Sequence, residues 1–313
     1  MSGCNVWDNG QNLSSDLTTN AQSQFVGSEQ SRTESEDINL SSANQAENNQ
    51  NLLIEILNAG QADCILITLP GNRYILIDGG NNNDGQKLVD YLKSKTISNI
   101  DFVIATHPHE DHIGGLDLII SSFDIGKIYM PKIHDSDVPT TKTYEDFLDA
   151  VSNRGYKISP AKAGSTLLDE GNLKLEFFAP NSDNYNNLNN YSAVIKLTYG
   201  NTRVLFAGDA ENVSENEMLK AGFNLKCDIL KVGHHGSNSS TTKEFLEAVD
   251  PKEAIISCGM GNQYGHPHAE TLQKLQAAGI NIHRTDQDGT VIITLDGNSY
   301  TISKHKDINI DGN

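Results

Sequence analysis

The chain has 313 residues and a formal net charge of −18, and its length fits one domain with an appendage or two small domains. A net charge of this sign repels nucleic-acid backbones and anionic membranes. A nucleic-acid partner is therefore disfavoured, although metal ions bound in a cleft can reverse the field there. No apolar run approaches the roughly 20 residues that a membrane-spanning helix requires, so we expect no transmembrane span.

Residues 1–50 consist largely of Ser, Asn, Gln, Glu and Thr, and the first lysine of the chain is Lys87. Because such a segment buries too little apolar surface to offset its ordering entropy, we predict a disordered polar tether over 1–50. Its opening Met-Ser-Gly-Cys resembles the end of a bacterial lipoprotein signal, without the basic and apolar stretch that normally precedes the cysteine. We therefore expect a lipid anchor at Cys4 and an extracellular, membrane-anchored protein. The alternative is a cytoplasmic protein with an ordinary polar N-terminus.

From residue 51 the chain alternates short apolar runs with helical patterns. Apolar runs bounded by Gly, Pro and Asn predict strands, and apolar positions three and four residues apart predict helices. In the first half the predicted strands cover 52–57, 64–69, 74–78, 101–105 and 127–130, and the predicted helices cover 85–95 and 143–153.

In the second half a strand at 173–178 precedes an Asn-rich loop at 181–190, and Gly200-Asn201 predicts a hairpin between strands at 193–198 and 203–207. Further strands are predicted at 228–232, 254–258, 290–294 and 299–303, and helices at 214–221, 241–249 and 269–278. Strand-rich segments that alternate with helices in two successive halves indicate two sheets packed face to face with helices outside. We thus predict an α/β fold, an αββα four-layer sandwich, over residues 51–305, with a tail at 306–313.

Three histidines and an aspartate gather directly after the predicted strand at 101–105. The segment reads ATHPHEDHIGGL, and its metal-binding candidates are His107, His109, Asp111 and His112. His107 and His109, two residues apart in an extended loop, can point to one metal ion, and Asp111 and His112 can turn towards a second. Since imidazole and carboxylate ligands suit zinc and manganese, we predict two divalent ions, Zn²⁺ or Mn²⁺.

One loop cannot fill two coordination spheres, and further candidates follow later predicted strands: Asp209 in LFAGDAE, His234 and His235 in ILKVGHHGS, and His266 and His268 in NQYGHPH. Because strand ends converge on one edge of an α/β sheet, these side chains should meet the first motif. We expect Asp209 to bridge the two ions and His235 to bind one. His234 and His266 are expected to bind metal or to act in catalysis, and His268 to lie at the surface.

The pattern His-x-His-x-Asp-His followed by Gly-Asp resembles the signature of the metallo-β-lactamase superfamily. The segments NAGQADCILI, ILIDGG, HPHEDHIGGL, FAGDAE, ILKVGHHGS and NQYGHPH are similar to the hydrolase domain of the ComEC-type DNA-uptake proteins, over about residues 52 to 303. The resemblance implies two β-sheets between helices, with two metal ions at one edge.

The resemblance also assigns roles to single residues. Where many members carry a further histidine before the Gly-Asp pair, this chain reads Asn189-Asn190-Tyr191-Ser192. The spacing from Asp209 to His235 is similar to that in bacterial phosphorylcholine esterases, which favours His235 over His266 as a ligand. Asp78 is expected to orient a ligand histidine. The catalytic candidates are Asp111, His234 and His266.

Two cations can lower the pKa of a water molecule to near neutrality, so we predict a metal-dependent hydrolase, a phosphodiesterase or nuclease-like enzyme. The alternatives are a phosphorylcholine esterase-like or other ester or amide hydrolase at the cell surface, and a non-catalytic metal-binding surface lipoprotein. The complete set of ligands for one ion argues against the last alternative. The acidic charge favours small, zwitterionic or choline-bearing substrates over long polyanions.

Overall fold

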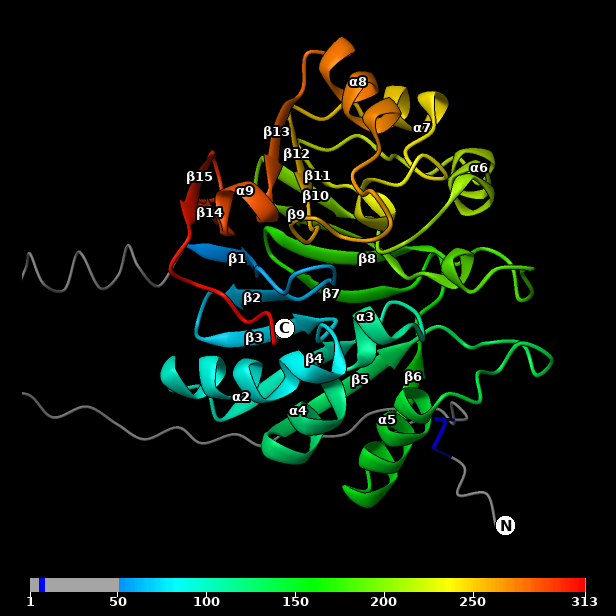
Figure 1. The fold of residues 1–313 in the computed structure, drawn as a ribbon, viewed down its shortest axis with the longest axis vertical. Helices are drawn as coiled ribbons and strands as arrows, with labels where there is room; N and C mark the ends of the chain where they lie inside the picture. The colour runs from blue at the N-terminus through cyan, green and yellow to red at the C-terminus, as the bar shows by residue number, and fades with distance from the viewer. Residues whose placement is uncertain (1–5, 9–50, 313) are drawn as a thin grey trace, which may run out of the picture.

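The computed structural model describes residues 6–8 and 51–312, which form two mixed β-sheets packed face to face (Figure 1). The first sheet has eight strands in the order β15-β14-β1-β2-β3-β4-β5-β6, and the second has seven in the order β13-β12-β11-β10-β9-β8-β7. The strands of the first sheet are β1 (Leu52–Ile56), β2 (Ile65–Leu69), β3 (Arg73–Ile77), β4 (Asn99–Ile104), β5 (Asp124–Met130), β6 (Ile158–Pro160), β14 (Thr290–Leu295) and β15 (Tyr300–His305). Those of the second are β7 (Thr166–Glu170), β8 (Leu173–Ala179), β9 (Val194–Tyr199), β10 (Thr202–Phe206), β11 (Ile229–Lys231), β12 (Glu253–Ile256) and β13 (Asn281–Arg284).

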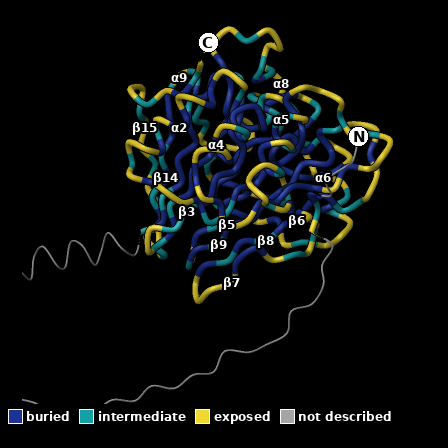
Figure 2. The backbone as a smooth tube through the Cα atoms, turned by 90° about the horizontal axis from the view of Figure 1, so that it is seen from below, coloured by how far each residue is buried: buried dark blue, intermediate teal, exposed yellow. Residues whose placement is uncertain are grey.

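Apolar residues on both faces of the central strands build separate layers of core. In β2, Ile65 and Ile67 pack between the two sheets, whereas Leu66 packs on the opposite face, beneath the helices. Since successive side chains of a strand point to opposite faces, a continuous apolar run is what a strand covered on both sides requires. Figure 2 shows buried residues throughout the interior and exposed residues on the loops and outer surfaces.

Helices cover the outer face of each sheet, and this confirms the predicted αββα four-layer sandwich (Figure 1). Helices α2 (Gly85–Ser94), α4 (Leu116–Ser122) and α5 (Lys142–Asn153) lie on the first sheet, and α6 (Asn212–Lys220), α7 (Lys243–Val249) and α8 (Ala269–Ala277) lie on the second. The loops contain α3 (Glu110–Ile113), α9 (Thr285–Asp288), η1 (Asn82–Asp84), η2 (Leu188–Tyr191) and η3 (Gly233–Gly236). No helix in the described part of the chain combines the length and apolar character needed to cross a membrane.

The sequence pattern does not predict three of the short strands, β6, β7 and β13. The segments of β7 and β13 read TLLDE and NIHR and lack strand-like alternation, so their extended form depends on pairing with β8 and β12. The hairpin predicted at Gly200-Asn201 is present, because β9 and β10 pair antiparallel with Tyr199 opposite Thr202.

Two terminal segments pack on the domain more closely than the sequence predicts. Within the predicted tether, Val6 is buried in the core of the first sheet, and its carbonyl oxygen accepts a hydrogen bond from the Ile158 amide at 2.8 Å. Within the predicted tail, Ile310 is buried and its amide donates to the Asn58 carbonyl oxygen at 2.9 Å. The rest of the predicted tether, including Cys4, lies outside the described residues.

Candidate metal centre

The histidine-rich motif connects β4 to α3 and is held in a buried turn. His109 immediately precedes α3, and Asp111 and His112 lie within this helix. His107 and His112 are completely buried. The loop after the carboxyl end of β4 therefore brings three imidazoles and a carboxylate together at the edge of the sandwich.

Four of the predicted residues converge as one ligand set. The ligand atoms of Asp111, His112, Asp209 and His235 all lie within 4.8 Å of one another. Asp209 Oδ2 is 3.3 Å from His112 Nε2 and 3.7 Å from His235 Nε2, and Asp111 Oδ2 is 3.3 Å from His235 Nε2. Two imidazoles and two carboxylates in this arrangement can hold one divalent ion.

Unpartnered buried atoms in this set test whether a metal ion fits. His112 Nε2, His235 Nε2 and Asp209 Oδ1 are buried and have no hydrogen-bond partner among the described residues. A buried polar atom without a partner costs about 1–3 kcal/mol. The two imidazole atoms both lie within 4 Å of Asp209 Oδ2, and a divalent cation held there would give each of them a partner.

A second pair of candidates also lies close to Asp209. His107 Nε2 is 2.9 Å from His109 Nδ1 and 3.9 Å from Asp209 Oδ2. We refer to Asp111, His112 and His235 as the Asp111 group, and to His107 and His109 as the His107 group. Asp209 faces both groups, which is the position required of a bridging carboxylate.

Residues beneath the ligands fix the orientation of their rings. Asp78 Oδ2 is 2.8 Å from His112 Nδ1, so the expected contact between Asp78 and a candidate ligand is present. The same carboxylate accepts a hydrogen bond from the Thr106 hydroxyl at 2.7 Å. His235 Nδ1 lies 3.1 Å from the carbonyl oxygen of Ser257. In each case the contact at Nδ1 leaves Nε2 facing the metal centre.

A buried ion pair joins the two sheets behind the site. Lys231 in β11 is completely buried, and its Nζ donates to Asp63 Oδ2 at 2.8 Å. Asp63 Oδ1 lies 3.7 Å from His235 Nδ1, and the Asp63 amide donates to the carbonyl oxygen of Asp111 at 3.0 Å. Asp63 therefore contacts two candidate ligands, one through its side chain and one through its backbone.

Unusual backbone conformations turn the ligands inward. His234 and His235 have φ values of 50° and 53°, in the left-handed region that non-glycine residues rarely adopt. Two such residues in succession cost of order 1–3 kcal/mol each, and strain of this kind clusters at functional sites. Gly208, at φ 52°, allows the chain to pass close to Ser192 and Thr106 just before Asp209.

The histidine pKa values are shifted in opposite directions in the two groups. Burial lowers the pKa of His107 well below its usual value, and His112 lowers it further. Burial opposes charge on His112 as well, but Asp209, Asp111 and Asp78 outweigh burial and raise the pKa of His112 well above its usual value. Burial raises the pKa of Asp209, yet His112 and His235 outweigh it and hold that pKa well below the usual range. Asp209 is thus charged at neutral pH, as a bridging ligand must be.

The ligands open into a cavity of about 330 Å³. The candidate ligands His109, Asp111, Asp209 and His235 line it together with Gln61, Glu110, Asn189, His234, Tyr264 and His266. No lysine or arginine is among these lining residues, and the carboxylates of Glu110, Asp111 and Asp209 make the walls acidic. A long polyanion therefore finds no lysine or arginine contact in this cavity.

The two remaining catalytic candidates lie in this cavity. His234 Nε2 is 3.8 Å from Asp209 Oδ2, and its Nδ1 is 3.2 Å from Glu211 Oε1. His266 Nδ1 is 3.4 Å from the Gln61 side-chain amide. Burial, followed by the nearby His234 and His235, lowers the pKa of His266 to about 4, so this ring is neutral at pH 7.

The other expectations for this region concern His268 and the Asn189–Ser192 segment. His268 is half-buried and does not line the cavity; its Nδ1 accepts from the Asn238 amide at 3.0 Å.

Asn189 does line the cavity, with its Nδ2 3.5 Å from His234 Nε2. Ser192 Oγ accepts from the Asp209 amide at 3.1 Å. The segment that replaces a histidine thus supports Asp209 and His234.

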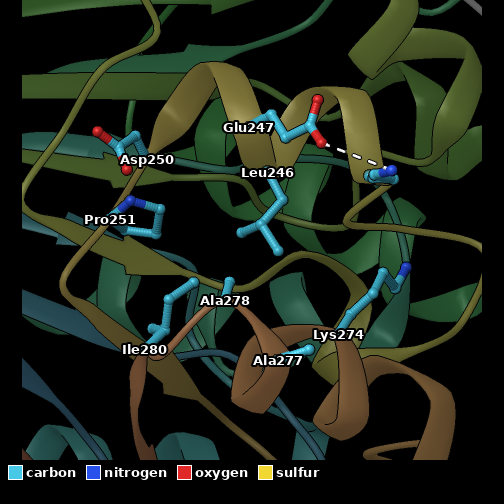
Figure 3. Close-up of a pocket in the computed structure, with 9 residues that line it drawn as sticks. Leu246, Glu247, Asp250, Pro251, Lys274, Ala277, Ala278 and Ile280 are labelled. Carbon is cyan, nitrogen blue, oxygen red and sulfur yellow. Dashed lines mark ion pairs between the residues drawn. The ribbon is translucent and has the colours of Figure 1, made fainter.

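A larger cavity of about 490 Å³ lies between α7 and α8 (Figure 3). Its walls include Leu246, Ile280 and the ion pair between Lys243 and Glu247, and no histidine lines it. Because this larger cavity lacks a convergent set of ligand atoms, we assign metal binding and catalysis to the smaller cavity.

Sequence reasoning from the residues misses Asp63, Lys231, Gln61 and Tyr264. A signal for Lys231 exists, because a lysine in a short buried strand such as ILK requires a buried partner. The sequence gives no partner, since Asp63 is 168 positions away. Gln61 and Tyr264 reach the cavity only through the fold.

The chain is similar in sequence to two curated bacterial proteins. The chain is 33% identical over 255 residues to ComE operon protein 3 of Bacillus subtilis, covering 76% of this chain and 32% of the relative. It is 28% identical over 240 residues to competence protein ComA of Neisseria gonorrhoeae, covering 76% of this chain and 31% of that protein. The chain therefore spans about a third of the length of these curated relatives.

Among solved structures, the fold is similar to that of CmlA, a diiron β-hydroxylase from Streptomyces venezuelae. The TM-score is 0.53 at 16% sequence identity, covering 78% of this chain and 54% of that protein. The sequence model described as the metallo-beta-lactamase superfamily matches residues 57–260. That segment contains both sheets' central strands, Asp209 and all residues of the Asp111 and His107 groups, so the chain belongs to the metallo-β-lactamase superfamily and is a metal-dependent hydrolase.

Proposed function

We propose that this protein hydrolyses phosphodiesters with two divalent ions, Zn²⁺ or Mn²⁺. The Asp111 group would hold one ion, the His107 group would hold the other, and Asp209 would be shared by both. The observation that carries it is the convergence of the unpartnered buried Nε2 atoms of His112 and His235 on Asp209 Oδ2, beside a cavity that Asp209 and His235 line.

Divalent ions bound there would supply Lewis-acid activation of a water nucleophile and stabilise negative charge on the phosphoryl oxygens. The chain's own residues then have separable tasks. Asp209 and Asp111 hold negative charge among the histidines, and Asp111 also faces the cavity, where it can orient the nucleophile. Asp78 keeps the Nδ1 of His112 occupied, so that only Nε2 is available to a metal ion.

His234 and His266 are proposed to act on the leaving group. Glu211 Oε1, 3.2 Å from His234 Nδ1, favours the ring orientation in which Nε2 faces the cavity. As an imidazolium whose Nδ1–H donates to Glu211, His234 can donate a proton from Nε2 to the departing oxygen. His266, neutral and held beside Gln61, lies edge-to-face with His234 at a centroid distance of 5.4 Å and can contact the same group.

The lining of the cavity favours a small phosphodiester over a long nucleic acid. Nucleic-acid affinity depends on lysine and arginine contacts to phosphates, and no such residue lines this cavity. The acidic lining residue Glu110 is also compatible with a choline-bearing phosphodiester, which is the second candidate substrate.

A substrate screen tests the proposal. Purified protein loaded with Mn²⁺ or Zn²⁺ is assayed against bis(p-nitrophenyl) phosphate, p-nitrophenyl phosphorylcholine, single-stranded DNA and a chromogenic cephalosporin, with the Asp209→Ala variant as control. We expect hydrolysis of a small phosphodiester by the wild-type protein only. Hydrolysis of the cephalosporin alone, or no metal-dependent hydrolysis of any phosphodiester, would contradict the proposal.

We also propose that the protein is held at the outer face of a membrane through a lipid on Cys4. The Ser-Gly-Cys tripeptide and the polar segment that follows it support this location. Mass spectrometry of the N-terminal peptide from the native host tests it: an unmodified Cys4 in material purified from the cytoplasm would exclude the anchor.

A further inference from the structure

The loop between β12 and α8 carries two exposed apolar side chains beside the metal centre. Tyr264 is 58% exposed and lines the cavity of the candidate ligands. Met260 is 83% exposed but does not line that cavity. Exposed aromatic rings at the mouth of a site commonly contact a bound molecule. Tyr264 is therefore placed to contact a ligand in the cavity, whereas Met260 is not.

Tyr264 is the outermost of three nearly parallel rings that lead from the metal centre to the mouth. His235 and His266 have ring centroids 6.3 Å apart with planes inclined by 19°. His266 and Tyr264 have centroids 5.6 Å apart with planes inclined by 24°. A flat group stacked against Tyr264 would therefore continue the series at the mouth of the cavity.

The backbone that carries Tyr264 is fixed by side-chain hydrogen bonds. Asn262 Oδ1 accepts from the amides of Tyr264 and His266 at 3.2 and 3.0 Å, and Asn262 Nδ2 donates to the carbonyl oxygen of Gly259 at 2.9 Å. Gln61 Oε1 in turn accepts from the Gly259 amide at 3.1 Å. The ring is thus exposed on a loop that is already held in place, which lowers the entropic cost of binding a ligand against it.

The remaining lining residues restrict what could lie there. The walls are acidic and carry no lysine or arginine, so a second phosphate beside the scissile one has no such side chain as a partner. An uncharged planar group has no such requirement, because stacking depends on its π-face alone.

We propose that Tyr264 binds an aromatic ring attached to the scissile phosphodiester, so that the substrates are aryl or nucleoside phosphodiesters of small size. The phosphoryl group would lie at the metal centre, and the ring would stack on Tyr264. This inference rests on the proposed phosphodiesterase function for the position of the phosphoryl group.

Ligand binding tests the inference without relying on turnover. Metal-loaded full-length protein is titrated calorimetrically with inorganic phosphate, thymidine 5′-monophosphate, phenyl phosphate and phosphocholine. Stacking of a base on an aromatic side chain is worth about 5- to 150-fold in affinity, so wild-type protein should bind thymidine 5′-monophosphate more tightly than phosphate by a factor in that range.

Variants of Tyr264 isolate the ring. Tyr264→Ala should remove the preference for thymidine 5′-monophosphate and leave the affinity for inorganic phosphate unchanged, whereas Tyr264→Phe should retain the preference. Met260→Ala, a more exposed residue of the same loop, should behave as wild type. Phenyl phosphate should follow thymidine 5′-monophosphate if any aryl group suffices, and phosphate if a nucleobase is required.

Each remaining outcome decides the question. An unchanged preference in Tyr264→Ala would overturn the inference, as would a loss confined to phosphocholine, which would assign Tyr264 to a cationic group instead. If Tyr264-dependent binding is observed but the wild-type protein hydrolyses no phosphodiester, the proposed function fails and the aromatic subsite stands.

Discussion

The two halves of the metal centre differ in how completely the chain builds them. The Asp111 group and Asp209 bring four ligand atoms within 4.8 Å of one another. Asp78 fixes the ring of His112, and the Ser257 carbonyl oxygen fixes the ring of His235. The His107 group contributes two histidines, and Asn189 is the cavity-lining residue of the segment where many superfamily members carry a third. The difference indicates that the fold preforms one coordination sphere, whereas the other depends more strongly on the shared Asp209.

Loss of the shared carboxylate should have the largest effect on this centre. Asp209→Ala should leave a folded protein with no detectable hydrolysis and with metal missing from both groups, because Asp209 Oδ2 lies 3.9 Å from His107 Nε2 and 3.3 Å from His112 Nε2. His109→Ala should also abolish hydrolysis, yet retain the ion of the Asp111 group. Metal stoichiometry by mass spectrometry, with circular dichroism as the control for folding, checks both. Full metal content and a near-normal rate in either variant would exclude the two-metal arrangement.

The neighbouring histidines of η3 should separate into ligand and catalyst. His235→Ala should lower metal occupancy, since His235 Nε2 lies between Asp111 and Asp209. His234→Ala and His266→Ala should keep most of the metal and lose turnover by roughly 10²–10⁴-fold, as expected for acid–base catalysis. Stoichiometry measured alongside kcat distinguishes the roles. Metal loss in His266→Ala with normal occupancy in His235→Ala would reverse the assignment.

The two groups should also respond differently to pH. Metal ions require neutral imidazoles, and the pKa of His112 is raised well above its usual value by Asp209, Asp111 and Asp78 despite burial. Protons therefore compete with the ion at the Asp111 group, and its metal affinity should strengthen as pH rises above the ordinary histidine pKa of about 6.5. Burial lowers the pKa of both His107 and His109, so the affinity of the His107 group should change little over that window.

Metal titrations of His109→Ala and His235→Ala, each with one group impaired, measure the two dependences separately. A flat pH profile for the His109→Ala protein, in which the Asp111 group is intact, would contradict this prediction.

The ion pair behind the Asp111 group should affect metal binding more than turnover per bound metal. Lys231→Met leaves Asp63 without its partner beside His235, and supporting contacts of this kind are worth about 10–100-fold in metal affinity. Lys196→Met is the matched control, because Lys196 is also buried in the second sheet but donates to the Asn224 carbonyl oxygen. Competition with a metal-binding dye should reveal weaker binding in Lys231→Met alone. Equal affinities in the two variants would assign Lys231 to folding only.

Deletion of residues 1–50 should have the smallest effect on the centre. It removes Val6, whose burial contributes about 1.5–3 kcal/mol at most, from the edge of the first sheet at β6. We expect a lower melting temperature with unchanged metal content and kcat. A Val6→Ala variant of the full chain should reproduce part of the change in melting temperature. A loss of metal on deletion would show that the N-terminal segment supports the site.

The sequence by itself determines the class of fold and most of the ligand set. Apolar runs and helical periodicity predict the four layers because burial on both faces of a strand leaves a local pattern in the chain. The motif from His107 to His112 also leaves a local pattern, because its four ligand candidates lie close together in the sequence. Asp209 and His235 are predicted because strand ends converge, although nothing local states their distances.

Only the tertiary structure decides which residues support and surround the ligands. The partner of Lys231 is 168 positions away, and Gln61 and His266, which contact each other at the cavity, are separated by 205. Val6 and Ile310 lie in segments whose polar composition predicts no packing, yet single apolar residues there are buried against distant strands and loops. Such contacts depend on the relative position of the two sheets, and that position is set by the whole core between them.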